Sequence, residues 1–126
     1  MTPRKRILVV DDEAVLRALF QEVLSDAGFD VATAPSGEAA LTFVVGGRVD
    51  LVVTDFNMGG MNGLELLGRI KAVKPSIPVI LLTSHVAPNT ALNALQGGAF
   101  WYLTKPVDVD LLVEKVQGAL DQKERV

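Results

Sequence analysis

Short apolar runs alternate along this chain with longer segments whose apolar residues recur at helical spacing. The expected strands cover residues 6–10, 30–33, 51–54, 78–82 and 100–104, and the expected helices cover 13–27, 38–45, 64–73, 88–95 and 109–120. The middle strands are apolar throughout, which is typical of strands covered by helices on both faces. Because helical crossovers between parallel strands are right-handed, this order predicts a (βα)5 chain folded as a doubly wound, five-stranded parallel sheet.

The length of 126 residues argues for a single domain over residues 1–126. Hydrophobic residues make up 49% of the chain and charged residues 21%, so the chain is globular rather than disordered. The common strand order for five such units is the flavodoxin-like order 2-1-3-4-5. Residues 121–126 are polar, and we expect this tail to fray.

Composition excludes several classes of function. The net charge of −3 leaves no broad basic face, so we expect no direct nucleic-acid binding by this domain. No run approaches the roughly 18 apolar residues of a membrane span. Cysteine is absent, which excludes disulfides and thiolate metal sites and fits a cytoplasmic location.

A polar residue of a particular kind ends each of four strands. Asp11 and Asp12 follow the first strand, Asp55 the third, Thr83 the fourth and Lys105 the fifth. Open α/β sheets bind ligands outside the carboxyl ends of their strands, where these side chains would gather. The order 2-1-3-4-5 also makes the first and third strands neighbours, which brings the three carboxylates together.

The chemistry of this cluster points to a metal ion and a phosphoryl group. Two carboxylates about 4 Å apart repel by roughly 4 kcal/mol at an effective dielectric constant near 20, so three of them need a cation or shared protons. Hard oxygen ligands suit Mg²⁺ or Mn²⁺, while Lys105 is a point charge for phosphate and Thr83 supplies a hydroxyl. A Gly-rich phosphate loop is missing after the first strand, so the phosphoryl group is expected on the protein itself, with an Asp nucleophile.

At this point the chain resembles the receiver domain of bacterial two-component response regulators, over residues 6 to 120. Four motifs in this order carry the resemblance: Leu8-Val9-Val10-Asp11-Asp12-Glu13, Asp55-Phe56-Asn57-Met58-Gly59-Gly60-Met61-Asn62-Gly63, Leu82-Thr83-Ser84 and Gly98-Ala99-Phe100-Trp101-Tyr102-Leu103-Thr104-Lys105-Pro106.

The resemblance implies a role for each residue of the cluster. Asp55 would be the phosphoacceptor, attacking a phosphohistidine of a sensor histidine kinase or a histidine phosphotransfer protein. Asp12, Asp55 and the backbone carbonyl of Asn57 would bind Mg²⁺ directly, and Asp11 would bind it through water. Lys105 would pair with the phosphoryl group. Such a domain phosphorylates and dephosphorylates itself as a signalling module and is not a turnover enzyme.

The resemblance also implies a conformational switch. Thr83 would move to hydrogen-bond the phosphoryl group, and Tyr102 would then turn inward. The face of the fourth helix, fifth strand and fifth helix would change and act on an unknown downstream output domain or protein, and a phosphorylation-dependent homodimer is also compatible. The Lys105–Pro106 peptide bond is usually cis in this family.

Two residues depart from the family pattern. Gly59 stands where proline is typical, which puts the rigidity of its loop in doubt, and Trp101 stands where a small or acidic residue is common. Trp101 is either a partner contact or a packing residue. We interpret His85 as an exposed loop residue rather than one that affects dephosphorylation, and Met58 and Met61 as loop packing.

Two other classes of function compete with this interpretation. A phosphatase or phosphotransferase of the haloacid-dehalogenase type would carry Asp-x-Asp after the first strand, whereas Asp55-Phe56-Asn57 follows the third. A phosphorylation-independent interaction module is disfavoured because the acceptor set is complete. Whether the domain acts alone or belongs to a longer regulator or hybrid kinase stays open.

Overall fold

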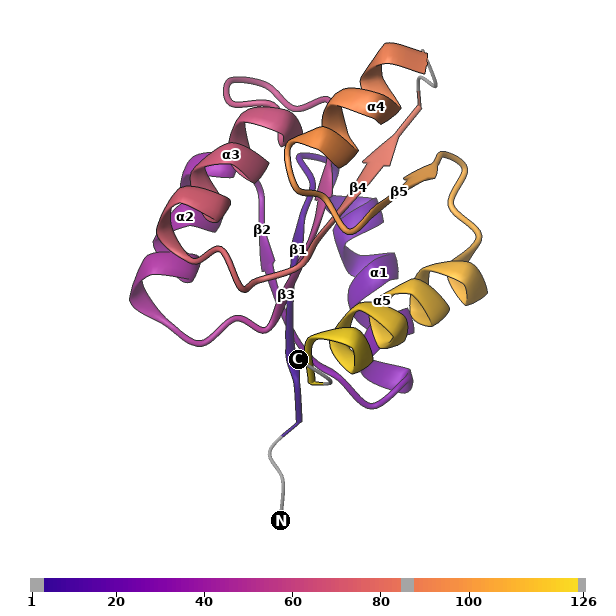
Figure 1. Cartoon of the computed structure of the whole chain (residues 1–126). Helices are drawn as coiled ribbons and strands as arrows, with labels where there is room; N and C mark the ends of the chain where they lie inside the picture. Colours follow the sequence, from indigo (N-terminus) through magenta and orange to yellow (C-terminus); the bar gives the residue numbers. More distant parts are fainter. Residues whose placement is uncertain (1–3, 85–87, 125–126) are drawn as a thin grey trace.

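The computed structural model describes residues 4–84 and 88–124, in which helices cover both faces of a five-stranded parallel sheet (Figure 1). The strands are β1 (Arg6–Val10), β2 (Asp30–Ala34), β3 (Leu51–Asp55), β4 (Val79–Thr83) and β5 (Trp101–Thr104). The helices are α1 (Ala14–Asp26), α2 (Gly37–Gly46), α3 (Gly63–Val73), α4 (Pro88–Gln96) and α5 (Val109–Glu124).

The strand order is β2-β1-β3-β4-β5, which confirms the predicted doubly wound topology. Neighbouring strands are parallel, and their register pairs Val10 with Thr54 and Thr83 with Thr104. The last residues of β1, β3, β4 and β5 therefore lie along one edge of the sheet. The polar residues at the strand ends can therefore meet along this edge.

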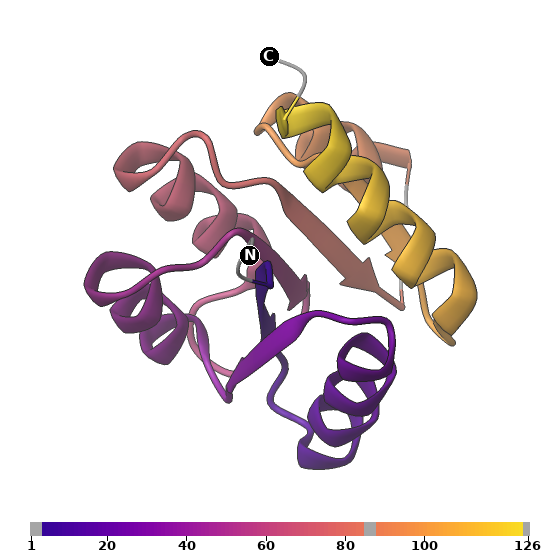
Figure 2. The same cartoon turned by 90° about the horizontal axis from the view of Figure 1, so that it is seen from below.

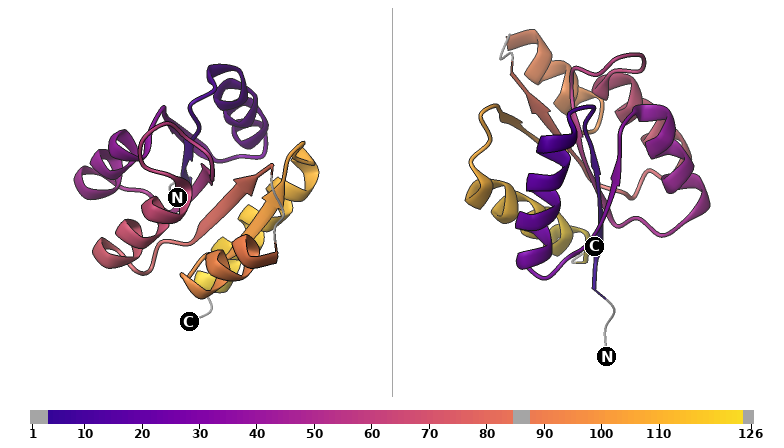
Figure 3. Two further views of the ribbon diagram at one scale, coloured as in Figure 1. Left: turned by 90° about the horizontal axis from the view of Figure 1, so that it is seen from above. Right: turned by 180° about the vertical axis from the view of Figure 1, so that it is seen from behind.

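Helices lie on both sides of the sheet, as the turned views show (Figures 2 and 3). An apolar layer between the sheet and the helices holds them together on each face. On one face, Leu8 and Val52 of the sheet pack with residues of α2, α3 and α4. On the other face, Val9 and Val53 pack with residues of α1 and α5. Successive strand residues thus point to opposite cores, which explains why the strands carry no polar alternation.

Short polar side chains begin three of the helices. In each case a side-chain oxygen accepts a hydrogen bond from a backbone N–H in the first turn, as N-cap residues do. These residues are Ser36 for α2, Asn62 for α3 and Asp108 for α5. Helix α5 continues through Glu124, so the tail that we expected to fray is helical up to residue 124, and residues 125–126 lie outside the described part. Across the described ranges, none of the helices has the length and apolar character needed to cross a membrane.

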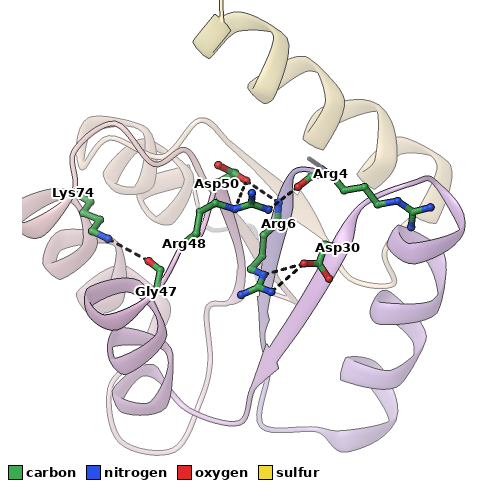
Figure 4. A network of polar contacts seen from close by, with 7 residues as sticks. All are labelled: Arg4, Arg6, Asp30, Gly47, Arg48, Asp50 and Lys74. Atoms are coloured by element: carbon green, nitrogen blue, oxygen red, sulfur yellow. Dashed lines mark hydrogen bonds and ion pairs between the residues drawn. The ribbon is translucent and has the colours of Figure 1, made fainter. Parts of the chain in front are cut away.

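Ion pairs tie the strands together at the opposite end of the sheet (Figure 4). The Arg6 guanidinium on β1 lies 3.0 Å from a carboxylate oxygen of Asp30 on β2, and the Arg6 backbone N–H donates to Asp50. Arg48 lies 3.6 Å from the same Asp50 carboxylate and donates to the backbone carbonyl of Arg4. These charges are paired with one another, far from the acidic edge.

Candidate functional site

The three predicted carboxylates meet at the carboxyl edge of the sheet. One oxygen each of Asp11, Asp12 and Asp55 lies within 4.8 Å of the others. They come together because β1 and β3 are neighbours, so that residues following β1 lie beside the last residue of β3. Asp11 is fully buried, Asp55 is 5% exposed and Asp12 is exposed to solvent.

Lys105, just after β5, reaches into this cluster. Its Nζ lies 3.1 Å from Oδ1 of Asp55 and 3.4 Å from Oδ2 of Asp11. The Lys105 backbone N–H donates to the carbonyl of Thr83 at 2.8 Å, which anchors its backbone to the end of β4. The Lys105–Pro106 peptide bond is cis, as the family resemblance implied.

Burial and charge act together on the two central ionisable groups. Burial raises the pKa of Asp55 above its ordinary value, the charges of Asp11 and Asp12 add to the rise, and Lys105 opposes it. Burial alone would lower the pKa of Lys105, but the hydrogen bond and negative charge of Asp55, with the charge of Asp11, outweigh it and raise that pKa. Lys105 therefore stays protonated, and the acidic cluster keeps excess negative charge that a cation would relieve.

The other predicted site residues occupy the same edge. Thr83 is the last residue of β4 and is 3% exposed, with Asp55 paired to the preceding Leu82. Asn57 lies two residues beyond Asp55 in the exposed start of the β3–α3 loop. His85 lies outside the described residues.

Two aromatic residues lie side by side on β5. Tyr102 is half-buried against the core beneath α2, α3 and α4. The rings of Trp101 and Tyr102 are stacked with centroids 5.9 Å apart, and Lys115 Nζ lies 5.0 Å from the Trp101 ring centroid. Trp101 thus packs against Tyr102 and α5 while 41% of its surface stays exposed, so both interpretations of Trp101 remain compatible with its place.

Packing against α2 anchors the β3–α3 loop. Met58 and Met61 lie against the core on that side, as predicted. Met61 fills the space beside Gly37 so closely that a Cβ on Gly37 would lie 2.9 Å from the Met61 sulfur. A Cβ on Gly59 would meet nothing within 4 Å, so the loop has room for a side chain at this position.

Sequence reasoning missed two residues that support the site. Arg17 Nη1 donates a 2.6 Å hydrogen bond to the backbone carbonyl of Asp11. Gly63, the first residue of α3, lies so close to β3 that a Cβ there would be 2.5 Å from the Asp55 carbonyl oxygen. The available signals were an arginine one turn into the helix that follows the acidic pair, and a glycine directly after an N-cap asparagine.

Comparison with known proteins agrees with this geometry. The model of the response regulator receiver domain family matches residues 7–117. The chain therefore belongs to this family of phosphoacceptor signalling domains of two-component systems. Asp11, Asp12 and Asp55 form an acidic cluster that could hold a metal ion.

Individual relatives show how far the similarity extends. Transcriptional regulatory protein GlrR of Escherichia coli (strain K12) is 41% identical over 116 residues, which are 92% of this chain and 26% of that protein. The chain thus spans about a quarter of the length of the curated relatives it matches.

Solved structures match over nearly their whole length. A response regulator receiver domain protein from Clostridium thermocellum has a TM-score of 0.90 at 34% identity, covering 95% of this chain and 97% of that one. Response regulator protein TrrA from Thermotoga maritima, in complex with Mg²⁺-BeF, has a TM-score of 0.84 at 40% identity, covering 92% of this chain and 99% of that one.

Proposed function

We propose that Asp55 accepts a phosphoryl group from a phosphohistidine of a sensor histidine kinase or a histidine phosphotransfer protein. The observation that carries the proposal is the setting of the Asp55 carboxylate at the end of β3. It lies 3.1 Å from the Lys105 ammonium, and its oxygen is within 4.8 Å of those of Asp11 and Asp12.

In the transfer, a carboxylate oxygen of Asp55 attacks the phosphorus atom of the phosphohistidine. A P–O bond forms, the P–N bond to the imidazole breaks, and its electron pair stays on the imidazole nitrogen. Lys105 would pair with a phosphoryl oxygen as the Asp55 carboxylate becomes an acyl phosphate. Catalysis of phosphoryl transfer consists mainly of positioning and charge neutralisation, which this arrangement supplies. Hydrolysis of the acyl phosphate by water would end the signal.

The donor set fits Mg²⁺, with Mn²⁺ as the alternative. Asp11 Oδ1 already accepts the backbone N–H of Glu13 at 2.9 Å, and its Oδ2 faces Lys105. As the family resemblance implies, Asp12, Asp55 and the backbone carbonyl of Asn57 would hold the ion directly, while Asp11 would act through water. A bound divalent ion would neutralise the carboxylates and the oxygens of the incoming phosphoryl group.

Phosphorylation would then change the partner-binding face formed by α4, β5 and α5. In our proposal, Thr83 turns toward the phosphoryl group and Tyr102 moves inward behind it. Tyr102 lies on β5, which is part of this face, and its ring is stacked on that of the exposed Trp101. A local charge change that biases a neighbouring two-state element is a common form of such switches. A phosphorylation-dependent homodimer through this face is compatible with the proposal.

We further propose that residues 1–126 form one receiver domain that works in the cytoplasm with an output unit. The curated relatives are transcriptional regulators about four times as long as the matched segment, which supports an output domain in the same protein. A separate partner protein is the alternative. Co-purification of the full-length regulator would distinguish the two arrangements, because a separate output protein would co-purify as a second chain and an output domain in the same protein would not.

Intact-mass spectrometry after incubation with acetyl phosphate tests the acceptor. We expect one added phosphoryl group in the presence of MgCl₂, little without it, and none in Asp55→Asn at any Mg²⁺ concentration. Asp26→Asn, which changes an exposed carboxylate at the end of α1, is the matched control and should label like the wild type. Mg²⁺-dependent labelling that persists in Asp55→Asn would remove Asp55 as the acceptor.

The same samples separate a receiver from a phosphatase. A receiver releases phosphate only as fast as its own acyl phosphate forms and decays, and phosphate esters such as p-nitrophenyl phosphate should not be turned over. Sustained turnover of such esters that depends on Asp55 would favour the phosphatase class instead.

A further inference from the structure

The side chain of Arg17 holds the backbone on which the acidic pair is built. Arg17 lies in the first turns of α1 and is half-buried. Its Nη1 donates to the carbonyl oxygen of Asp11 at 2.6 Å, across six residues of sequence. That carbonyl belongs to the peptide that joins Asp11 to Asp12, one residue past the end of β1.

Every polar group of Asp11 has a partner in the protein. Its N–H donates to the carbonyl of Ala34, Oδ1 accepts from the Glu13 N–H, and Oδ2 faces Lys105. The Arg17 guanidinium completes the set by donating a hydrogen bond to the Asp11 carbonyl oxygen. Asp12 differs because it is exposed, so its position depends on the peptide that carries it.

We propose that Arg17 is a positioning residue for the cation site: by holding the Asp11–Asp12 peptide, it aims the Asp12 carboxylate at Asp11 and Asp55. This inference rests on the proposed function, because it assumes that the carboxylates bind a divalent cation. Residues that orient metal ligands typically contribute about 10- to 100-fold to metal affinity.

A positioning role and a purely electrostatic role of Arg17 predict opposite changes in Mg²⁺ affinity when Arg17 is replaced. The guanidinium carries a positive charge close to the acidic cluster, so removing the charge alone would make the cluster more negative and tighten Mg²⁺ binding. Removing the anchor of the peptide would instead let Asp12 swing away and weaken Mg²⁺ binding. The sign of the change therefore identifies the role of Arg17.

The experiment measures Mg²⁺ affinity by calorimetry without any phosphoryl donor. We expect Arg17→Met, which keeps the side-chain stem but has no donor, to bind Mg²⁺ about 10-fold more weakly than the wild type. Arg17→Lys, which retains a charged donor, should recover most of the affinity. Arg69→Met, on the exposed side of α3, is the matched control and should bind like the wild type.

Two further measurements complete the test. In metal-free protein, the amide NMR signals of Asp12 and Glu13 should shift in Arg17→Met and stay in place in Arg69→Met. In acetyl phosphate labelling, Arg17→Met should need about 10-fold more Mg²⁺ for half-maximal rate but approach the wild-type rate at saturation.

Failure of the inference and failure of the proposed function look different. Unchanged or tighter Mg²⁺ binding by Arg17→Met would overturn the positioning role while wild-type labelling stood. A wild-type protein that neither binds Mg²⁺ nor takes up a phosphoryl group would overturn the proposed function itself. If Arg17→Met does not fold, Arg17→Leu, which also has no donor, gives the same comparison, and its amide signals show whether the native fold is present.

Discussion

Gly63, at the start of α3, packs against the backbone that carries the acceptor. A Cβ at this position would lie 2.5 Å from the Asp55 carbonyl oxygen and 2.9 Å from the Phe56 Cα, where ordinary contacts begin near 3.4 Å. Both atoms are backbone, so no side-chain rotation relieves the clash, and α3 must move away from β3. Gly63→Ala should therefore cost about 2 kcal/mol of unfolding free energy, within the range for overpacking. For a domain of this size that lowers Tm by about 8 °C.

Gly68 in the same helix provides the matched control. A Cβ there would meet no atom within 4 Å, so Gly68→Ala should gain about 0.4–1 kcal/mol through the lower entropy of the unfolded chain. Thermal unfolding followed by circular dichroism should move Tm down in Gly63→Ala and up in Gly68→Ala. Acetyl phosphate labelling well below both Tm values should be slowed only in Gly63→Ala, because only that change displaces Asp55. If both variants shifted Tm in the same direction, the close approach of α3 to β3 would be refuted.

Three more perturbations test the site and its supports. Because burial raises the pKa of Asp55, its ionised form costs native stability above the ordinary carboxyl pKa of 3.8, so metal-free Asp55→Asn should unfold at a higher temperature than the wild type at pH 7.5. This gap should shrink as the pH falls through the raised pKa, and a gap that widens toward acid would contradict the assignment. Added Mg²⁺ at about 100 times its Kd should raise the unfolding free energy by about 2.7 kcal/mol, and Asp12→Asn should lose most of this gain in the same titration. Asn62→Ala removes the 2.8 Å hydrogen bond to the Glu65 N–H and should cost about 1 kcal/mol in denaturant unfolding, whereas a midpoint equal to that of the wild type would show that water replaces the cap.

Element boundaries show where sequence patterns lose information. The pattern ended the third strand at Thr54, yet β3 includes Asp55 because its backbone pairs with Leu82 of β4. The pattern also ended the last helix near Leu120, whereas α5 continues to Glu124. Backbone hydrogen bonding can continue past the last apolar side chain, so hydrophobic periodicity alone places an end only to within a few residues.

The sequence by itself determined the architecture and the composition of the site. Alternating strand and helix patterns predict a parallel sheet for a chain of this length, and the order 2-1-3-4-5 that is common for five such units then places the first and third strands side by side. Asp11, Asp12, Asp55 and Lys105 each end a strand, so the topology was enough to predict that they meet.

Only the tertiary structure decided how these groups are held. Arg17 donates to the Asp11 carbonyl from the helix that follows β1, and the lack of a side chain at Gly63 lets α3 pack against the backbone of β3. Both contacts are made to backbone atoms, which are the same in every residue, so the sequence could suggest Arg17 and Gly63 but could not identify the atoms they contact. Their existence depends on the distance between packed elements, and that distance is set by the whole core.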